Sequence, residues 1–285
     1  MAIYIHFFRD SGLEKLDFLK VFEFFESYPN FKIFYTDEEV QIDYRDDDFK
    51  FAYRYLITKK SRVSQIYKLN PQYLNVNFLL ELPVLVPSFL VKEILALTQK
   101  LCKLFDLEIY NDVFQDVQPF NLADVVVLFE NMRREAIAQY GMQDKLSFEK
   151  DKLDEVCRYQ RSVASLREYY HNEVEVNLVE PIIDKITNEY GISVVWNAGV
   201  PTVFPPHLSY IYVKEEQNIP FLVRRKDFMS IMGKYLIEIV NFLPDMYILK
   251  PKQAKASRKV LNKLRKVAII DQNFKSVRLA NLIDI

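Results

Sequence analysis

Apolar and polar residues alternate along much of the first 118 residues, which is the pattern of half-buried β-strands. Val40, Ile42 and Tyr44 alternate with Gln41 and Asp43. The other strands predicted for this region cover residues 3–8, 31–35, 49–58, 74–82 and 107–110. Because most of these strands follow one another directly, we expect a largely antiparallel sheet.

Two segments of this region have apolar residues at helical spacing instead. Ser11 and Glu14 have the spacing of a capping box, which predicts a helix from residue 11 to Tyr28. A second helix is predicted over residues 88–105. Residues 1–118 are therefore predicted to form an α+β sheet domain with both helices packed on the sheet.

Residues 119–175 have the pattern of a helical hairpin. Helical spacing covers residues 122–140 and 147–171, and Gly141 is placed to end the first helix. We expect the hairpin to pack on the protein's own sheet or, alternatively, to present a surface to a protein partner.

A second α+β unit is predicted over residues 176–249. It begins with a helix over 178–190, and a further helix covers 228–242. Four strands lie between these helices, at residues 192–196, 203–204, 208–214 and 220–224. In the third strand the tyrosines and the aliphatic residues occupy alternate positions, which predicts an aromatic face and an aliphatic face.

Charge is distributed very unevenly along the chain. The formal net charge is −1, but residues 250–285 hold ten basic and two acidic residues, or +8, and the other 249 residues carry −9. If residues 251–268 form one helix, the lysines fall on one stripe, and an adjacent face carries Val260, Leu261, Leu264 and Val267. Arg258 and Arg265 lie on a third side. The basic residues of this predicted helix are Lys252, Lys255, Arg258, Lys259, Lys263, Arg265 and Lys266.

Three interpretations of this basic C-terminal helix remain open. In the first, the apolar edge of the helix docks on the rest of the chain, which is acidic, and the lysines neutralise that acidic part or stay solvated. In the second, the lysine row, roughly 21 Å long, follows the phosphates of a nucleic acid or another polyanion. The third is a membrane-surface helix, which an apolar edge without Trp or Phe disfavours. Residues 274–285 form either a last strand or a partner-binding tail.

Catalytic motifs are absent from the sequence. The glycine-rich motifs for dinucleotides and phosphates and the nucleophile elbow do not occur, and the chain has only five glycines. None of the three histidines has metal-ligand spacing. The acidic run Asp46–Asp48 is typical of a hairpin end. We therefore predict no catalytic residue, no metal and no cofactor.

One loop stands out by its composition. Residues 196–207 contain three prolines, one glycine and the only tryptophan of the chain. Such a stiff loop is a candidate binding surface, formed by Trp196, Asn197, Phe204 and His207. Alternatively, it crosses an edge of the sheet and buries Trp196.

The two cysteines lie far apart, and the N-terminus lacks the basic and apolar regions of a signal peptide. We therefore expect a cytoplasmic protein without a transmembrane segment. The predicted fold class is α+β, with largely antiparallel sheets, packed helices, the central hairpin and the basic C-terminal helix.

Our functional hypothesis is a non-catalytic interaction or regulatory protein whose basic helix contacts a polyanionic partner, nucleic acid or an acidic protein. One alternative is a metal-dependent enzyme acting on a phosphorylated or nucleotide substrate. The other is an obligate subunit of a protein complex.

Overall fold

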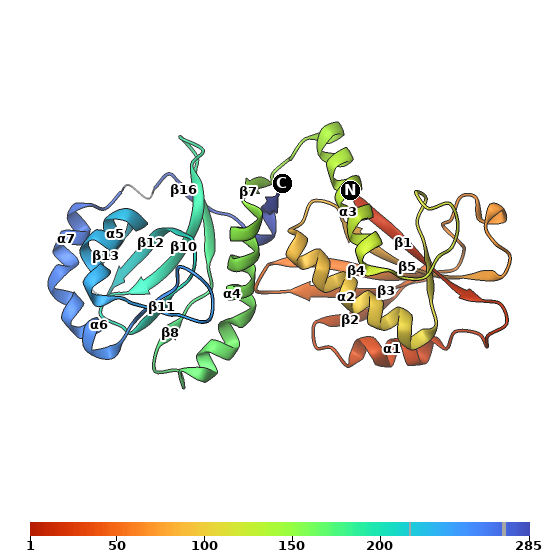
Figure 1. Ribbon diagram of the computed structural model, residues 1–285, viewed down its shortest axis with the longest axis horizontal. Coiled ribbons are helices and arrows are strands. Elements are labelled where there is room, and N and C mark those ends of the chain that lie inside the picture. Colours follow the sequence, from red (N-terminus) through yellow and green to blue (C-terminus); the bar gives the residue numbers. More distant parts are fainter. Residues whose placement is uncertain (217, 270–271) are drawn as a thin grey trace. The chain divides into compact units, whose positions relative to one another are not determined.

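The computed structural model describes residues 1–216, 218–269 and 272–285. Helices and mainly antiparallel sheets confirm the α+β class. The chain forms two compact units, unit 1 from Met1 to Leu146 and unit 2 from Ser147 to Ile285 (Figure 1). Among the described residues, no helix is both long and apolar enough to cross a membrane.

Unit 1 is built on a six-stranded antiparallel sheet with the strand order β2-β3-β4-β5-β1-β6. The strands are β1 (Ala2–Asp10), β2 (Phe31–Tyr35), β3 (Glu39–Asp46), β4 (Phe51–Thr58), β5 (Tyr73–Pro83) and β6 (Glu108–Tyr110). The predicted run of consecutive antiparallel strands is thus confirmed for β2 to β5, and β1 lies between β5 and β6.

The helices of unit 1 are α1 (Phe18–Glu26), η1 (Ile66–Lys68), α2 (Ser88–Phe105) and α3 (Leu122–Tyr140). Aromatic rings fill the space between the sheet and the helices α1 and α2. Tyr55 of β4 lies 4.8 Å from the Phe25 ring of α1, and its hydroxyl lies 2.9 Å from the Thr98 hydroxyl of α2. Because both helices contact Tyr55, they cover the same face of the sheet.

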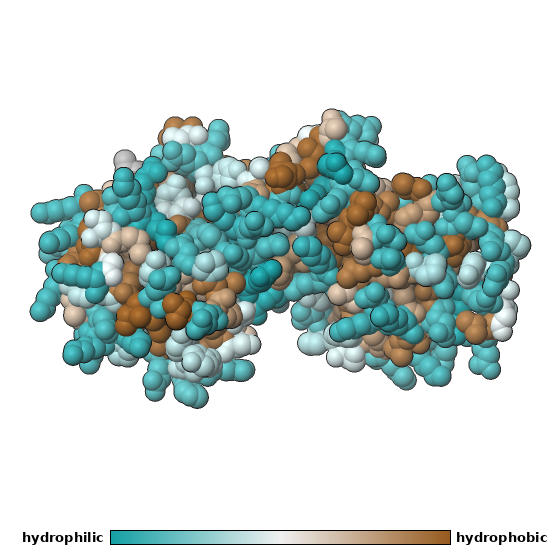
Figure 2. Space-filling model, viewed as in Figure 1, coloured by the Kyte–Doolittle hydropathy of each residue, from teal (hydrophilic) through white to brown (hydrophobic). Residues whose placement is uncertain are grey.

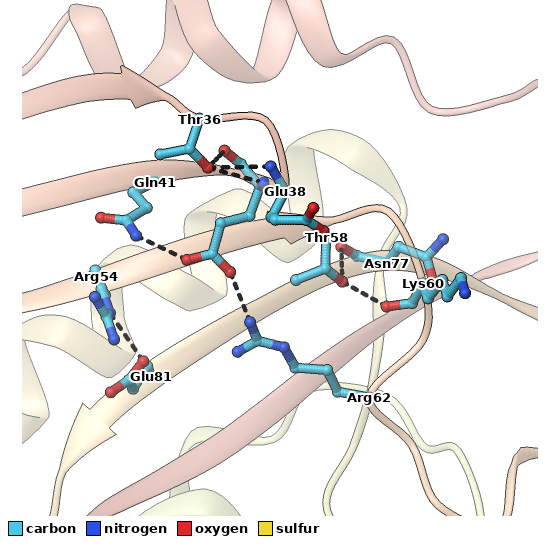
Figure 3. A network of polar contacts seen from close by, with 10 residues as sticks. Thr36, Glu38, Gln41, Arg54, Thr58, Lys60, Arg62, Asn77 and Glu81 are labelled. Atoms are coloured by element: carbon cyan, nitrogen blue, oxygen red, sulfur yellow. Dashed lines mark hydrogen bonds and ion pairs between the residues drawn. The ribbon is translucent and has the colours of Figure 1, made fainter.

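The opposite face of this sheet carries polar side chains that bind one another (Figure 3). Glu39 accepts hydrogen bonds from Gln41 at 2.7 Å and from Arg62 at 2.6 Å. Arg54 on β4 donates to Glu81 on β5 at 2.8 Å. These partly exposed ion pairs contribute at most about 1 kcal/mol each. The polar positions of the alternating pattern therefore lie on this face.

The first helix does not begin where the capping box predicted. The helix α1 starts after Asp17, whose carboxylate accepts a hydrogen bond from the backbone N–H of Leu19 at 3.0 Å. Asp10 instead accepts from the backbone N–H of Gly12 at 2.7 Å and closes a turn. The prediction from residue 11 is wrong because a competing side chain stabilises the turn.

Unit 2 contains three sheets, with the strand orders β13-β12-β10-β9-β16, β14-β15-β11-β8 and β17-β7. The strands that come first in the chain are β7 (Leu146–Phe148), β8 (Glu175–Val176), β9 (Glu180–Asp184), β10 (Tyr190–Asn197), β11 (Thr202–Phe204) and β12 (Leu208–Glu215). They are followed by β13 (Asn218–Arg224), β14 (Ile237–Glu238), β15 (Tyr247–Leu249), β16 (Phe274–Ser276) and β17 (Leu282–Asp284). Two pairs, β10–β12 and β11–β8, are parallel.

The helices of unit 2 are α4 (Lys150–Tyr169), α5 (Arg225–Met232), η2 (Gly233–Tyr235), α6 (Pro251–Ser257), η3 (Arg258–Val260), α7 (Leu261–Lys266) and η4 (Leu279–Asn281). On β12, Ile211 and Val213 are buried on the side of the sheet where α5 packs. On the same side, the buried Trp196 ring lies 5.7 Å from the Phe228 ring of α5. Tyr210 and Tyr212 alternate with these aliphatic residues and therefore lie on the other face.

The two helices predicted to form a central hairpin exist as α3 and α4, but the boundary between the units falls between them. In unit 1, Arg133 of α3 donates to the carbonyl of Val86 at 3.5 Å. In unit 2, the Tyr159 hydroxyl of α4 donates to the carbonyl of Asn177 at 2.9 Å. Each helix buries its apolar face in its own unit. The contacts thus place α3 in unit 1 and α4 in unit 2.

Two helix predictions for residues 176–249 are wrong, the first in whole and the second in part. Residues 178–190 form the strand β9 and a turn, in which Asp184 accepts a hydrogen bond from the backbone N–H of Ile186 at 2.8 Å. The helix predicted over 228–242 ends at Met232, and the 3₁₀ turn η2 and the short strand β14 follow it. In both places pairing with a neighbouring strand overrides the apolar spacing, which by itself is compatible with a helix.

Candidate polyanion-binding surface

The predicted basic helix is present, but it is not a single regular helix. It consists of α6, the 3₁₀ turn η3 and α7. Its buried residues are Ala254, Ser257, Val260 and Leu264. The first three follow one another at steps of three residues, which is the period of a 3₁₀ helix rather than the 3.6 residues of an α-helix. The chain therefore tightens at η3 so that these side chains share one buried face.

This buried face fixes the direction of the basic residues. Ala254, Ser257 and Leu264 are fully buried, and the Ser257 hydroxyl donates to the carbonyl of Ala254 at 2.8 Å. The side of the segment away from the unit is left to the charged residues. All seven basic residues singled out in the sequence are exposed: Lys252, Lys255, Arg258, Lys259, Lys263, Arg265 and Lys266. In Figure 2 the surface over α7, at the left edge, is mainly hydrophilic.

The two arginines differ from the lysines because they contact the body of unit 2. Arg265 donates to Glu215 of β12 at 2.7 Å and lies over the Phe221 ring at 5.6 Å. The side chain of Arg258 packs on Gly199, where a Cβ atom would come within 2.3 Å of the arginine Nε. The absence of a side chain at Gly199 thus allows this approach.

None of the five lysines forms an ion pair within 4.0 Å with any residue that the structure describes. From Lys252 to Lys266 the segment is roughly 22 Å long, counting about 1.5 Å per α-helical residue and about 2.0 Å per 3₁₀ residue. In this part of the chain, no lysine neutralises a neighbouring carboxylate. Five solvated ammonium groups therefore line one exposed segment.

The candidate binding loop contributes less than its composition suggests. Trp196 and Phe204 are 0% and 3% exposed, and their rings pack against Phe228. The indole N–H of Trp196 donates to the carbonyl of Val200 at 3.2 Å. The alternative in which the loop buries its tryptophan is the one observed, so these two rings are not available to a partner.

The two other residues of this loop hold internal contacts. His207 places Nε2 at 2.5 Å from a carboxylate oxygen of Glu155 on α4. The side-chain amide of Asn197 donates to Glu175 at 2.8 Å. Both residues are partly exposed. These contacts connect the loop to α4 and β8, which the sequence did not indicate because the partners are 52 and 22 residues away.

The described acidic and thiol groups do not gather into a metal site. Among residues 1–216, 218–269 and 272–285, no group of three or more His, Cys, Asp or Glu side chains is arranged to hold a metal ion. In the acidic run, Asp46 accepts a hydrogen bond from the backbone N–H of Phe49 at 3.0 Å and closes the turn between β3 and β4. Cys102 and Cys157 are both buried, and burial raises the pKa of the Cys102 thiol.

Comparisons with known proteins identify no relative. No protein-family model, curated protein or solved structure matches the chain. The feature of the chain with the clearest functional character is the segment from Lys252 to Lys266, in which the basic side chains are exposed and Val260 and Leu264 are buried.

The basic residues of this surface are evident in the sequence, but the residues that position them are not. Glu215 and Gly199 fix the two arginines from distant parts of the chain. Gly199 is one of only five glycines in the chain, and a glycine can indicate that another group approaches the backbone closely. The sequence does not show that the approaching group is Arg258.

Proposed function

We propose that the protein is a cytoplasmic, non-catalytic interaction protein that binds a polyanion, nucleic acid first among the candidates, through the exposed lysines of α6, η3 and α7. The observation that carries the proposal is that five lysines without an ion-pair partner among the described residues lie on a segment whose apolar residues are buried. The charge supports it, since the other 249 residues carry −9 and would repel a polyanion elsewhere.

Composition favours contacts to phosphates over contacts to bases. Residues 250–269 contain no Phe, Tyr or Trp, so the segment offers no ring on which an unpaired base stacks. Lysine binds phosphate as a point charge and carries no sequence information. We therefore expect binding to double-stranded nucleic acid with little dependence on its sequence.

The test is a comparison of duplex binding by the full chain and by two variants of equal charge. In the first variant all five lysines, Lys252, Lys255, Lys259, Lys263 and Lys266, are replaced by glutamine. In the control, five exposed lysines of unit 1 are replaced instead: Lys32, Lys59, Lys60, Lys100 and Lys103. Fluorescence anisotropy with a labelled duplex of about 30 base pairs gives the affinities.

Losing five phosphate contacts lowers the affinity at low salt by at least about 100-fold in the first variant. The control changes the net charge equally but leaves the surface intact, so its affinity stays within about threefold of the unmodified chain. Equal losses in the two variants, or no binding by the unmodified chain, contradict the proposal.

The alternatives of a metal-dependent enzyme and of an obligate complex subunit are not favoured by any specific contact among the described residues. A membrane-surface role is disfavoured by the burial of Val260 and Leu264, because an interfacial helix needs its apolar side chains free to enter the lipid.

A further inference from the structure

A small groove lies on the five-stranded sheet of unit 2, on the face opposite α5. Its volume is about 230 Å³. Three side chains from adjacent strands form its floor, because Tyr212 on β12 is in register with Val195 on β10 and with Leu222 on β13. Phe274 of β16 forms a further part of the lining. The floor is therefore continuous, apolar and partly aromatic.

The floor remains partly open to solvent. Leu222 is almost fully buried, but Val195, Tyr212 and Phe274 are only half-buried. Ile211 and Val213 of β12 lie on the other face, which α5 covers. Half-exposed apolar and aromatic side chains around a concavity are the usual lining of a small-molecule site.

One charged group at the groove is free to bind a ligand. Lys214 is two residues beyond Tyr212, so it lies on the same face of the strand. It is exposed and forms no ion pair with a residue that the structure describes.

The acidic group that lines the groove lies at its other end. Glu180 is in register with Ser193, which precedes Val195 by two residues, whereas Lys214 is in register with Asn197, which follows Val195 by two. The Glu180 carboxylate also accepts a hydrogen bond from the Ser276 hydroxyl. The ligand is therefore expected to carry a negative charge near Lys214 and an apolar body over Tyr212.

We propose that this groove binds a small aromatic carboxylic acid, with the carboxylate paired to the Lys214 ammonium and the ring over Val195, Tyr212 and Leu222. The volume is below the roughly 300–1,000 Å³ of sites for drug-sized ligands, which favours a single ring. The site is separate from the exposed lysines of α6, η3 and α7, and the inference does not depend on polyanion binding.

Titration calorimetry with phenylacetate as the probe tests the proposal on the full chain. We expect saturable binding with a dissociation constant on the order of 1 mM. The neutral analogue 2-phenylethanol binds about fivefold more weakly, because it does not pair with Lys214, and the cationic analogue benzylamine, which Lys214 repels, binds more weakly still. Equal binding of all three compounds, or no saturation up to about 20 mM phenylacetate, overturns the proposal.

Three variants locate the site. Lys214→Gln weakens phenylacetate binding by about fivefold, and Val195→Phe, which fills the floor, also weakens it. Lys226→Gln removes an exposed lysine of the same unit that does not line the groove, and it leaves the affinity unchanged. Circular dichroism checks that each variant is folded. The five-lysine variant also binds phenylacetate like the unmodified chain, and a loss there assigns the binding to the other surface and overturns the proposal.

Discussion

Replacement of Phe228 by alanine tests the core that holds the sheet of unit 2 against α5. The Phe228 ring is 1% exposed and lies 5.7 Å from the Trp196 ring and 5.2 Å from the Phe204 ring. Both neighbours are themselves buried and are held by strand pairing, so they cannot collapse freely into the space that the ring leaves. The variant therefore loses the transfer free energy of the ring and also retains much of a cavity.

A buried phenylalanine replaced by alanine costs about 3–5 kcal/mol of unfolding free energy. With a urea dependence of about 2 kcal/mol per molar, a loss of about 4 kcal/mol lowers the midpoint of unfolding by about 2 M. Trp196 is the only tryptophan of the chain and belongs to unit 2, so its fluorescence in a urea titration reports on this unit alone.

Phe242→Ala is the matched control, because Phe242 is in the same unit but 46% exposed. We expect this control to change the unfolding free energy by no more than about 0.5 kcal/mol. Equal midpoints for the two variants, or a Phe228→Ala midpoint within about 0.3 M of the unmodified chain, refute the described packing.

Three further predictions concern other parts of the molecule. Tyr55→Phe removes the buried hydrogen bond to Thr98 and lowers the stability of unit 1 by about 1 kcal/mol in urea titrations followed by circular dichroism; no change contradicts the contact. Gly199→Ala introduces a Cβ atom at a φ of +80° and 2.3 Å from the Nε of Arg258, so the Trp196-monitored unfolding free energy falls by about 1 kcal/mol or more, and an unchanged value refutes the approach. Burial lowers the pKa of His6, so the unfolded state binds more protons than the folded state once the pH falls below about 6.5, and stability decreases there. His6→Asn reduces this loss between about pH 7 and pH 5, and an identical pH profile for the variant is the contrary result.

Alternation along the chain was sufficient to predict most strands, because a half-buried strand has one polar and one apolar face. In β3 the polar positions Glu39 and Gln41 share one face, where Gln41 donates a hydrogen bond to Glu39 and Arg62 donates a second. The pairing of strands far apart in the sequence was not predictable. Two examples depend on contacts between distant segments. The strand β1 lies between β5 and β6, and β9 pairs with β16.

Short apolar segments were the main source of error. Residues 178–190 have apolar positions that fit a helix, and only pairing of β9 with its two neighbours decides for a strand. In the basic segment, Val260 and Leu264 of the predicted apolar face are buried. Ala254 and Ser257 are buried beside them, and periodicity did not identify these two because alanine is small and serine is polar.

The salt dependence of duplex binding measures most directly whether the exposed lysines bind phosphates. Five contacts predict a slope of about −4.5 for the logarithm of the association constant against the logarithm of the salt concentration. Between about 50 mM and 200 mM salt the affinity then falls by roughly 500-fold. The variant in which the five lysines are replaced by glutamine has a slope near zero. An unmodified chain whose binding does not depend on salt, or a variant whose slope equals that of the unmodified chain, contradicts the assignment of the surface.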